Sequence, residues 1–137
     1  MSLKIAICLA AALAASFTVP SVRAQDHGRV FELRTYHCNE GKLPDLLARF
    51  RNHTIAIFNK HGITSIAYWV PQDAPASQNT LIYIIAHSSR EQAKKNWAAF
   101  GADPEWQKVQ KESEEHGKLV NKVDSVFMEA TDFSPLK

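Results

Sequence analysis

Three stretches of the C-terminal half decide the fold: N-T-L-I-Y-I-I-A-H at 79–87, N-W-A-A-F-G-A-D-P-E-W at 96–106 and A-T-D-F-S-P at 130–135. The first predicts a strand, because it is a short apolar run bounded by polar residues. The second predicts two helical pieces, with Asp103 as the N-cap of the second piece and Pro104 at its first position. The third closes a final short strand. A strand, a broken helix and a strand therefore follow one another with little connecting chain.

The N-terminal half predicts the remaining elements. Val30–His37 alternates apolar and polar residues, which is typical of a half-buried strand. Lys42–Lys60 carries apolar residues at helical spacing, and Gly62 follows it as the residue type that favours the left-handed conformation at a helix end. Ile63–Val70 is expected to be a second strand, and Pro71–Asn79 the hairpin loop that leads to the third.

The third strand is expected at Thr80–His87, followed by a helix that begins at Ser88 or Ser89 and ends at Gly101. A fourth strand is expected at Val123–Ala130. The order β-α-β-β-α-β predicts an α+β fold of the ferredoxin-like type. This fold has a four-stranded antiparallel sheet with its helices on one face, and here the second helix is broken in two.

The strand at Thr80–His87 is apolar on both faces between Leu81 and Ala86. An antiparallel sheet with one solvated face alternates instead, and helices on one side cover only one face. The chain after residue 24 has 137 − 24 = 113 residues, a length that suits one domain with no spare element. A second copy of the chain, packed sheet against sheet, is the predicted cover. The alternative is that the strand is apolar only because it is central in the sheet.

Residues 1–24 are predicted to be a secretory signal peptide, and residues 25–137 a single domain. The apolar run Ile5–Leu13 follows a positive residue and is too short to span a bilayer. We expect cleavage between Ala24 and Gln25. The product would be a secreted or periplasmic protein with no stable membrane anchor after cleavage. An uncleaved anchor is the alternative.

The predicted mature chain carries no net charge. The whole sequence has 16 Lys+Arg against 14 Asp+Glu, and the signal segment holds Lys4, Arg23 and no acid, which leaves 16 − 2 = 14 bases against 14 acids. This balance gives no electrostatic reason to expect nucleic acid or an anionic membrane as a partner. Cys38 is the one cysteine left after cleavage, so no intramolecular disulfide is possible. A lone cysteine is typically a small buried apolar side chain.

The histidines do not form a metal site in the sequence. His53 and His61 share the predicted first helix but lie about 12 Å apart along its axis. No C-x-x-C, H-E-x-x-H or two-His-plus-carboxylate cluster occurs. We therefore predict no metal and no cofactor. His61, beside Gly62, is expected to satisfy carbonyl groups at the helix end.

Alternation in the first strand gives a candidate ligand pocket. If Phe31 and Leu33 face the helices, then Glu32, Arg34 and Tyr36 face the interior of a barrel formed with the partner copy. An arginine and a tyrosine in a mainly apolar cavity suit an anionic or phenolic ligand. The full candidate set, with residues of other elements, is Arg34, Tyr36, Trp69, Tyr83, His87 and His53.

The alternative for the charged residues of this strand is structural. Arg34 would then form an internal ion pair with Glu32 or Glu129, whose purpose is to satisfy buried charge. No nucleophile–base pair marks catalytic residues, so these stay unknown and the sequence does not decide whether the protein is an enzyme.

The chain resembles the NIPSNAP family, within the dimeric α+β-barrel superfamily, over residues 29–136. The matching segments are E-L-R-T-Y (32–36), G-K-L (41–43), K-H-G (60–62), Trp69, W-A-A-F (97–100), D-P-E-W (103–106) and T-D-F-S-P (131–135). The resemblance implies a homodimer whose two sheets face each other. It implies no defined activity, because the known members are mostly uncharacterised.

Two functions follow as expectations. The first is a secreted or periplasmic homodimer that binds a small ligand or a protein partner without catalysis. The second comes from the superfamily, which includes haem-degrading and quinol-type monooxygenases. It is a cofactor-independent or haem-linked monooxygenase acting on a small aromatic or anionic substrate through Arg34, Tyr36 and either His53 or His87.

Overall fold

The computed structural model describes residues 28–137, so the predicted signal peptide and its cleavage site lie outside the described residues. Within this range, no helix has both the length and the apolar composition needed to cross a membrane. The elements in chain order are β1 (Val30–Cys38), α1 (Leu43–Arg49), a π-helical turn η1 (Phe50–Thr54), α2 (Ile55–Lys60), β2 (Thr64–Trp69), α3 (Ala76–Asn79), β3 (Thr80–His87), α4 (Arg90–Ala102), α5 (Pro104–Ser113) and β4 (Val120–Met128).

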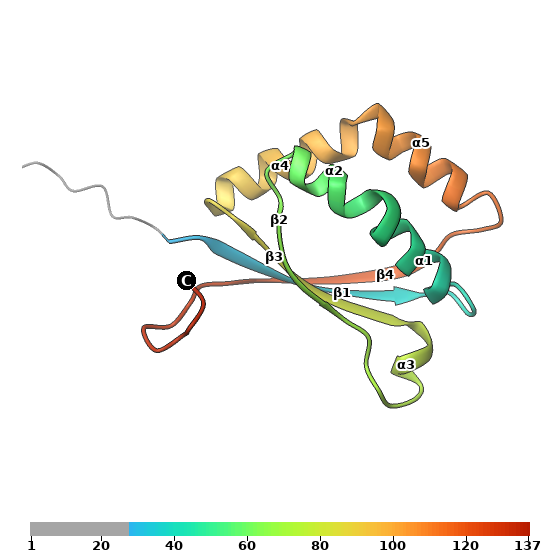
Figure 1. Cartoon of the computed structure of the whole chain (residues 1–137), viewed down its shortest axis with the longest axis horizontal. Helices are drawn as coiled ribbons and strands as arrows, with labels where there is room; N and C mark the ends of the chain where they lie inside the picture. Colours follow the sequence, from blue (N-terminus) through green and yellow to red (C-terminus); the bar gives the residue numbers. More distant parts are fainter. Residues whose placement is uncertain (1–27) are drawn as a thin grey trace, which may run out of the picture.

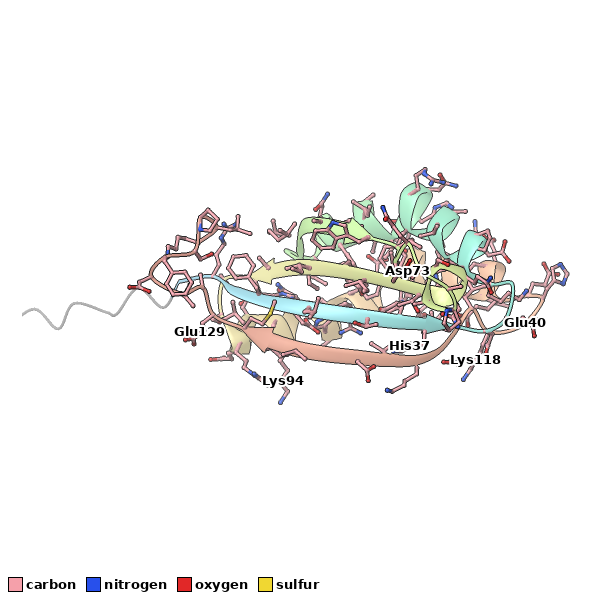
Figure 2. All side chains as sticks on the ribbon, turned by 90° about the horizontal axis from the view of Figure 1, so that it is seen from below. His37, Glu40, Asp73, Lys94, Lys118 and Glu129 are labelled. Carbon is pink, nitrogen blue, oxygen red and sulfur yellow. The ribbon has the colours of Figure 1, made fainter. Side chains whose placement is uncertain are left out.

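The strands form one antiparallel sheet in the order β2-β3-β1-β4, with the helices α1, α2, α4 and α5 on one side of it (Figure 1). The short helix α3 and the C-terminal turn extend toward the other side (Figure 1). This confirms the predicted ferredoxin-like α+β fold with a broken second helix. Seen from below, the sheet lies in front of the helices, and we refer to this side as the open face (Figure 2).

The break between α4 and α5 is fixed by one aspartate. Asp103 accepts a hydrogen bond from the backbone N–H of Glu105 at 2.8 Å, as the N-cap prediction requires. Its carboxylate also binds Lys60 Nζ at 2.8 Å and His61 Nε2 at 2.6 Å. These bonds, that of Lys60 foremost, hold the pKa of Asp103 well below its usual range. These bonds tie the end of α2 to the start of α5. The sequence analysis expected His61 to satisfy carbonyl groups at the helix end, whereas in the structure its Nε2 binds the Asp103 carboxylate.

Several element boundaries differ from the sequence prediction. The first helix is not a continuous α-helix, because the turn at Phe50–Thr54 is π-helical. The predicted hairpin loop contains the short helix α3. Gly101 lies inside α4 instead of ending it, and β4 begins earlier than predicted, at Val120. Of the two candidate caps of α4, Ser89 is the one used, and its side chain accepts from the backbone N–H of Gln92 at 3.0 Å.

The core lies between the helices and the sheet. Tyr83 and Ile85 of β3 are fully buried there, together with Leu46 of α1 and Phe58 of α2. Cys38 belongs to the same core and is almost fully buried, and this burial raises the pKa of its thiol. Cys38 is therefore the small buried side chain that the sequence predicted.

The predicted facing of β1 is wrong. Glu32 accepts a hydrogen bond from Trp97 of α4, and Tyr36 packs edge-on against Phe50 of η1, so these residues and Arg34 between them face the helices. The prediction assumed that charged residues lie on the uncovered side of a sheet. Here the charges lie on the covered side, because each finds a partner there.

The open face of the sheet is largely apolar. The register places Leu33 opposite Ile84 and Val126, which extends the apolar surface across three strands. Trp69 is half exposed at one edge of this surface. Towards the other edge, His37 Nε2 meets the Asp124 carboxylate at 2.9 Å, and Figure 2 labels His37. The open face is therefore an apolar surface bordered by charged groups.

Two glycines that were both predicted to end a helix are expected to respond in opposite ways to substitution by alanine. Gly62 has φ +70° and should lose about 1–2 kcal/mol of unfolding free energy in Gly62→Ala, because a side chain is strained in that conformation. Gly101 lies in α4 with no atom within 4 Å of an added Cβ, so Gly101→Ala should gain about 0.5–1 kcal/mol. Urea unfolding followed by tryptophan fluorescence measures both. A loss in both variants would contradict the helical placement of Gly101.

Candidate functional site

The carboxylate of Glu32 is the centre of the polar cluster beneath the helices. Its Oε1 accepts from Arg34 Nη1 at 2.7 Å and from Ser125 Oγ at 2.7 Å. Its Oε2 accepts from Trp97 Nε1 at 2.7 Å and lies 3.3 Å from His87 Nε2. Burial acts to raise the pKa of Glu32, but these four bonds hold the pKa at about 2. Glu32 is therefore ionised although it is 1% exposed.

The cluster continues from Glu32 through His87 to the loop that follows α2. Asn96 Nδ2 lies 3.2 Å from His87 Nδ1 and donates to the Gly62 carbonyl at 3.0 Å. Because the Asn96 amide N–H donates to His87 Nδ1, this nitrogen is the acceptor. His87 Nε2 then carries the ring proton and donates a hydrogen bond to the Glu32 carboxylate. Both ring nitrogens of His87 are thus engaged.

The guanidinium of Arg34 lies close to two aromatic rings. Its guanidinium lies 4.3 Å from the ring centre of Trp97 and 5.4 Å from that of Tyr36. Its Nη2 lies 3.5 Å from the Tyr36 hydroxyl. Burial acts to lower the pKa of Arg34, but the neighbouring Tyr36, Tyr83 and Glu32 raise it above its ordinary value. Arg34 is a fixed cation at every pH at which the protein is folded.

A cavity of about 260 Å³ opens next to Tyr36, between η1, α5 and the strands β1 and β4. We name it the aromatic cavity after the five rings that line it, those of Tyr36, Phe50, Phe58, Phe100 and Trp106. Neighbouring rings meet at offset or edge-on angles, with centroids 4.4–6.0 Å apart. Polar residues also line it: Arg49, Thr54, Gln110, Glu114, Lys118, Asn121 and Lys122. The cavity lining therefore combines aromatic rings with polar side chains.

The π-helical turn shapes one wall of the aromatic cavity. Arg49, Phe50, Thr54 and Phe58 all line the cavity, and all four are buried. A π turn adds one residue to the helical repeat and leaves a carbonyl group free, and Thr54 Oγ1 donates to the Arg49 carbonyl at 3.3 Å. The irregular turn thus aims several side chains at one space.

Four of the predicted pocket residues lie in or next to this region. Arg34 and Tyr83 are directly opposite each other in the β1–β3 ladder. The rings of Tyr83 and Tyr36 are 5.2 Å apart, and His87 joins Arg34 through the shared carboxylate of Glu32. The grouping predicted from the sequence is therefore present for these residues, but on the helix side of the sheet.

The other two predicted residues lie elsewhere. Trp69 is opposite Ile82 in the register of the open face and is 50% exposed. His53 lines a separate cavity of about 400 Å³ between α1, η1 and α5, where His116 and Glu112 also lie. Among residues 28–137, no group of three or more His, Cys, Asp or Glu is placed to hold a metal ion.

Sequence reasoning missed three parts of the site. No sequence signal assigned a polar role to Trp97, whose indole N–H donates to the Glu32 carboxylate at 2.7 Å. Ser125 lies in a strand that was predicted without any functional role, and Phe50 turns toward the cavity through a π turn that has no sequence signature. The structural alternative for Arg34 is confirmed in part, because Arg34 pairs with Glu32 at 2.7 Å. The pair coexists with the cavity.

The comparisons with known proteins agree on a family. The model of the NIPSNAP family matches residues 31–135. A NIPSNAP family protein of unknown function from Agrobacterium tumefaciens is 26% identical with a TM-score of 0.69, and the match covers 81% of this chain and 96% of that chain. An uncharacterised NIPSNAP-like domain protein from Burkholderia xenovorans is 21% identical with a TM-score of 0.68, covering 81% and 93%. A search of curated proteins found no match.

A more distant structure is similar in fold alone. A monooxygenase from Streptomyces coelicolor, solved in complex with nanaomycin D, is 16% identical with a TM-score of 0.53, and the match covers 80% of this chain and 94% of that chain. Its reaction and its ligand belong to that protein.

Replacing Glu32 by glutamine is expected to destabilise the fold and flatten its acid response. The folded pKa of about 2 lies below the ordinary 4.5, so the carboxylate contributes its stability above pH 4.5 and loses it as the pH falls toward 2. That contribution is worth about 3 kcal/mol. Glu32→Gln should lose it already at pH 7. Urea unfolding between pH 7 and pH 2.5 measures the difference.

The matched control is Ser125→Ala, which removes one donor and keeps the charge of Glu32. It should cost about 1 kcal/mol and retain the acid-dependent loss. If the free energy of unfolding falls by the same amount in the wild type and in Glu32→Gln between pH 7 and pH 2.5, then Glu32 is not a buried anion in the folded protein.

Proposed function

We propose a function from one established premise: the chain belongs to the NIPSNAP family. The proposed protein is an exported homodimer that binds a small ligand in the aromatic cavity of each subunit and does not turn it over. The observation that carries this proposal is the aromatic cavity, whose lining residue Tyr36 has its hydroxyl 3.5 Å from Nη2 of Arg34, a cation held by Glu32 and Trp97. A preformed apolar cavity with a few fixed polar groups is the usual form of a small-molecule site.

The state of the histidines supports binding over turnover. A general base needs a free ring nitrogen within reach of the ligand. His87 is 2% exposed and uses both ring nitrogens within the cluster, while His53 lies in the other cavity. The same engagement removes His87 as a ligand for haem iron, since coordination would require breaking its bond to Glu32 or Asn96. The proposal invokes no cofactor.

A monooxygenase reaction in the same cavity is the second candidate. Two observations favour it. The chain shares its fold with the Streptomyces monooxygenase, and the aromatic cavity has a volume and a lining that suit a small aromatic substrate. Arg34 and Tyr36 would then orient the substrate. Oxygen consumption in the presence of a ligand recovered from the protein separates the two candidates, because a pure binding protein consumes none.

The homodimer is supported by the open face. Leu33, Ile84 and Val126 form a continuous apolar surface across three strands, and within residues 28–137 the helices α1, α2, α4 and α5 all lie on the opposite side of the sheet (Figure 1). An apolar centre bordered by charged groups is the anatomy of a protein interface. A second copy, sheet against sheet, fits this surface because its own open face has the same composition.

Two valines of β4 test the two faces separately. Val126 is 54% exposed on the open face, and Val123 is 42% exposed and lines the aromatic cavity. Val126→Lys should give a monomer that still binds ligand, because a buried lysine without a partner disrupts an apolar interface. Val123→Lys should remain a dimer and lose the ligand. Native mass spectrometry of residues 25–137 measures both mass and bound ligand.

A dimeric Val126→Lys variant, or a monomeric wild type, would contradict the proposed homodimer. The same spectra show whether the wild-type protein carries additional small-molecule mass. A wild-type dimer without bound mass, which also takes up no small molecule from a periplasmic extract, would contradict the ligand-binding half alone.

Export is tested by expressing the full chain in a bacterial host. We expect a periplasmic product whose first residue is Gln25, because the apolar run and the small residues before Gln25 fit a signal peptidase site. Fractionation and intact mass measure both. Retention of residues 1–24 in a membrane fraction would support the uncleaved anchor instead.

A further inference from the structure

The C-terminal turn, residues 131–137, presents an aromatic side chain to the outside of the subunit. Phe133 is 84% exposed, the highest value for a large apolar side chain among residues 28–137. The turn extends toward the same side of the sheet as the open face (Figure 1). Single apolar residues are common on protein surfaces, so the exposure of Phe133 acquires meaning only from what lies around it.

Hydrogen bonds hold this turn in one shape. The Ser134 backbone N–H donates to the Thr131 carbonyl at 3.1 Å. Arg29 Nε, just before β1, donates to the Lys137 carbonyl at 2.9 Å. The turn is therefore fastened to itself and to the start of the sheet. A ring on such a preformed turn loses less conformational entropy on binding than a ring on a free tail.

A groove of about 250 Å³ lies where this turn meets the open face. We name it the end groove, and its lining includes Phe31, Ile84 and Met128 of the sheet and Ala130 and Leu136 of the chain beyond β4. An apolar cavity of about 150 Å³ holds a benzene molecule, so the end groove has room for one phenyl ring.

The ring of Phe133 does not fill the end groove of its own subunit. Phe133 is not among the residues that line the groove, although its neighbours Thr131 and Ser134 are. The same turn thus carries an exposed aromatic ring and one wall of an apolar groove that the ring does not enter.

Two-fold symmetry provides a way to match the ring with the groove. In a symmetric dimer, residue i of one copy contacts residue j of the other, and j contacts i. The turn follows β4 at the end of the sheet where β1 begins, since Met128 is opposite Phe31 in the register. A two-fold axis that runs along the strands, between two open faces, brings these equivalent ends together. Each turn then lies opposite the turn of the other copy.

We propose that each copy of the chain inserts Phe133 into the end groove of a second copy, so that the two C-terminal turns exchange aromatic anchors. This inference rests on the proposed homodimer and adds the residue that each copy contributes to the other. The end groove is continuous with the open face, because Ile84 belongs to both. Aromatic side chains buried in pockets supply much of the binding energy of protein interfaces.

The first test removes the ring. Phe133→Ala should raise the dissociation constant of the dimer about a hundredfold, because two anchors are lost per dimer and each is worth about tenfold. Sedimentation velocity over a dilution series of the exported protein measures it. The matched control is Asp132→Asn, which changes the neighbouring exposed side chain, keeps Phe133 and should leave the dissociation constant close to that of the wild type.

The same substitution should not weaken the fold of a single copy. Phe133 is exposed in the subunit, so its removal costs nothing in a monomer. Urea unfolding of Val126→Lys, with and without Phe133→Ala, measures this in a background that the proposed interface makes monomeric.

The second test asks whether the ring crosses from one copy to the other. Ala130→Trp places a bulky side chain in the lining of the end groove and should weaken its own homodimer as Phe133→Ala does. In a one-to-one mixture of these two variants, the heterodimer regains one contact, because one copy still has the ring and the other still has the open groove. Native mass spectrometry should then show heterodimer well above the half of all dimers, about 50%, that random pairing gives.

An unchanged dissociation constant for Phe133→Ala would overturn the exchange and leave the proposed homodimer standing. Random pairing in the mixture would overturn it as well, because ring and groove would then not meet between copies. A loss of unfolding free energy on adding Phe133→Ala to Val126→Lys would show that the ring packs within its own copy. A monomeric wild type would contradict the exchange and the homodimer together.

Discussion

The structure depends on keeping one carboxylate ionised inside the fold. Moving a charge from water to the interior is costly, and an isolated buried carboxylate would take up a proton instead. Glu32 avoids this with donors from four elements: Arg34 in its own strand and one residue each from β3, α4 and β4. The requirement to satisfy this charge therefore positions α4 against the sheet, and it fixes Arg34 next to Tyr36, which lines the aromatic cavity.

The charge also explains why the usual binary pattern is inverted in β1. Charged residues are normally on the solvated face of a sheet and apolar ones on the covered face. Here the covered face holds Glu32 and Arg34, and the open face holds Leu33. An apolar open face is unfavourable for a solitary domain, which is the physical reason for the proposal that this strand contributes to an interface between copies as well as to the internal site.

Much of the fold was predictable from local signals. The strands, the capped break at Asp103 and the left-handed Gly62 follow from patterns within a few residues, and each is present. The face of β1 that packs against the helices, and the geometry of the site, depend on residues that are far away in the sequence. Alternation along β1 sorts its residues into two faces. It does not show which face packs against the helices when each face has partners of its own. The position of Ser125 and the π turn that directs Phe50 arise from packing, for which the sequence carries no periodic signal.

A strand whose two faces both have roles tolerates no shift of register. Moving β1 by one residue would carry Leu33 into the polar cluster and Arg34 onto the open face, so the cavity and the apolar surface would be lost together. The hydrogen bonds of Glu32 oppose such a shift, because they connect β1 to β3, to β4 and to α4 at one position along the strand. A neutral apolar residue at this position would pack against the same helix but would specify the register less strictly. We therefore infer that the buried ion pair specifies the register of β1, a role that an apolar pair of similar volume would fill less well.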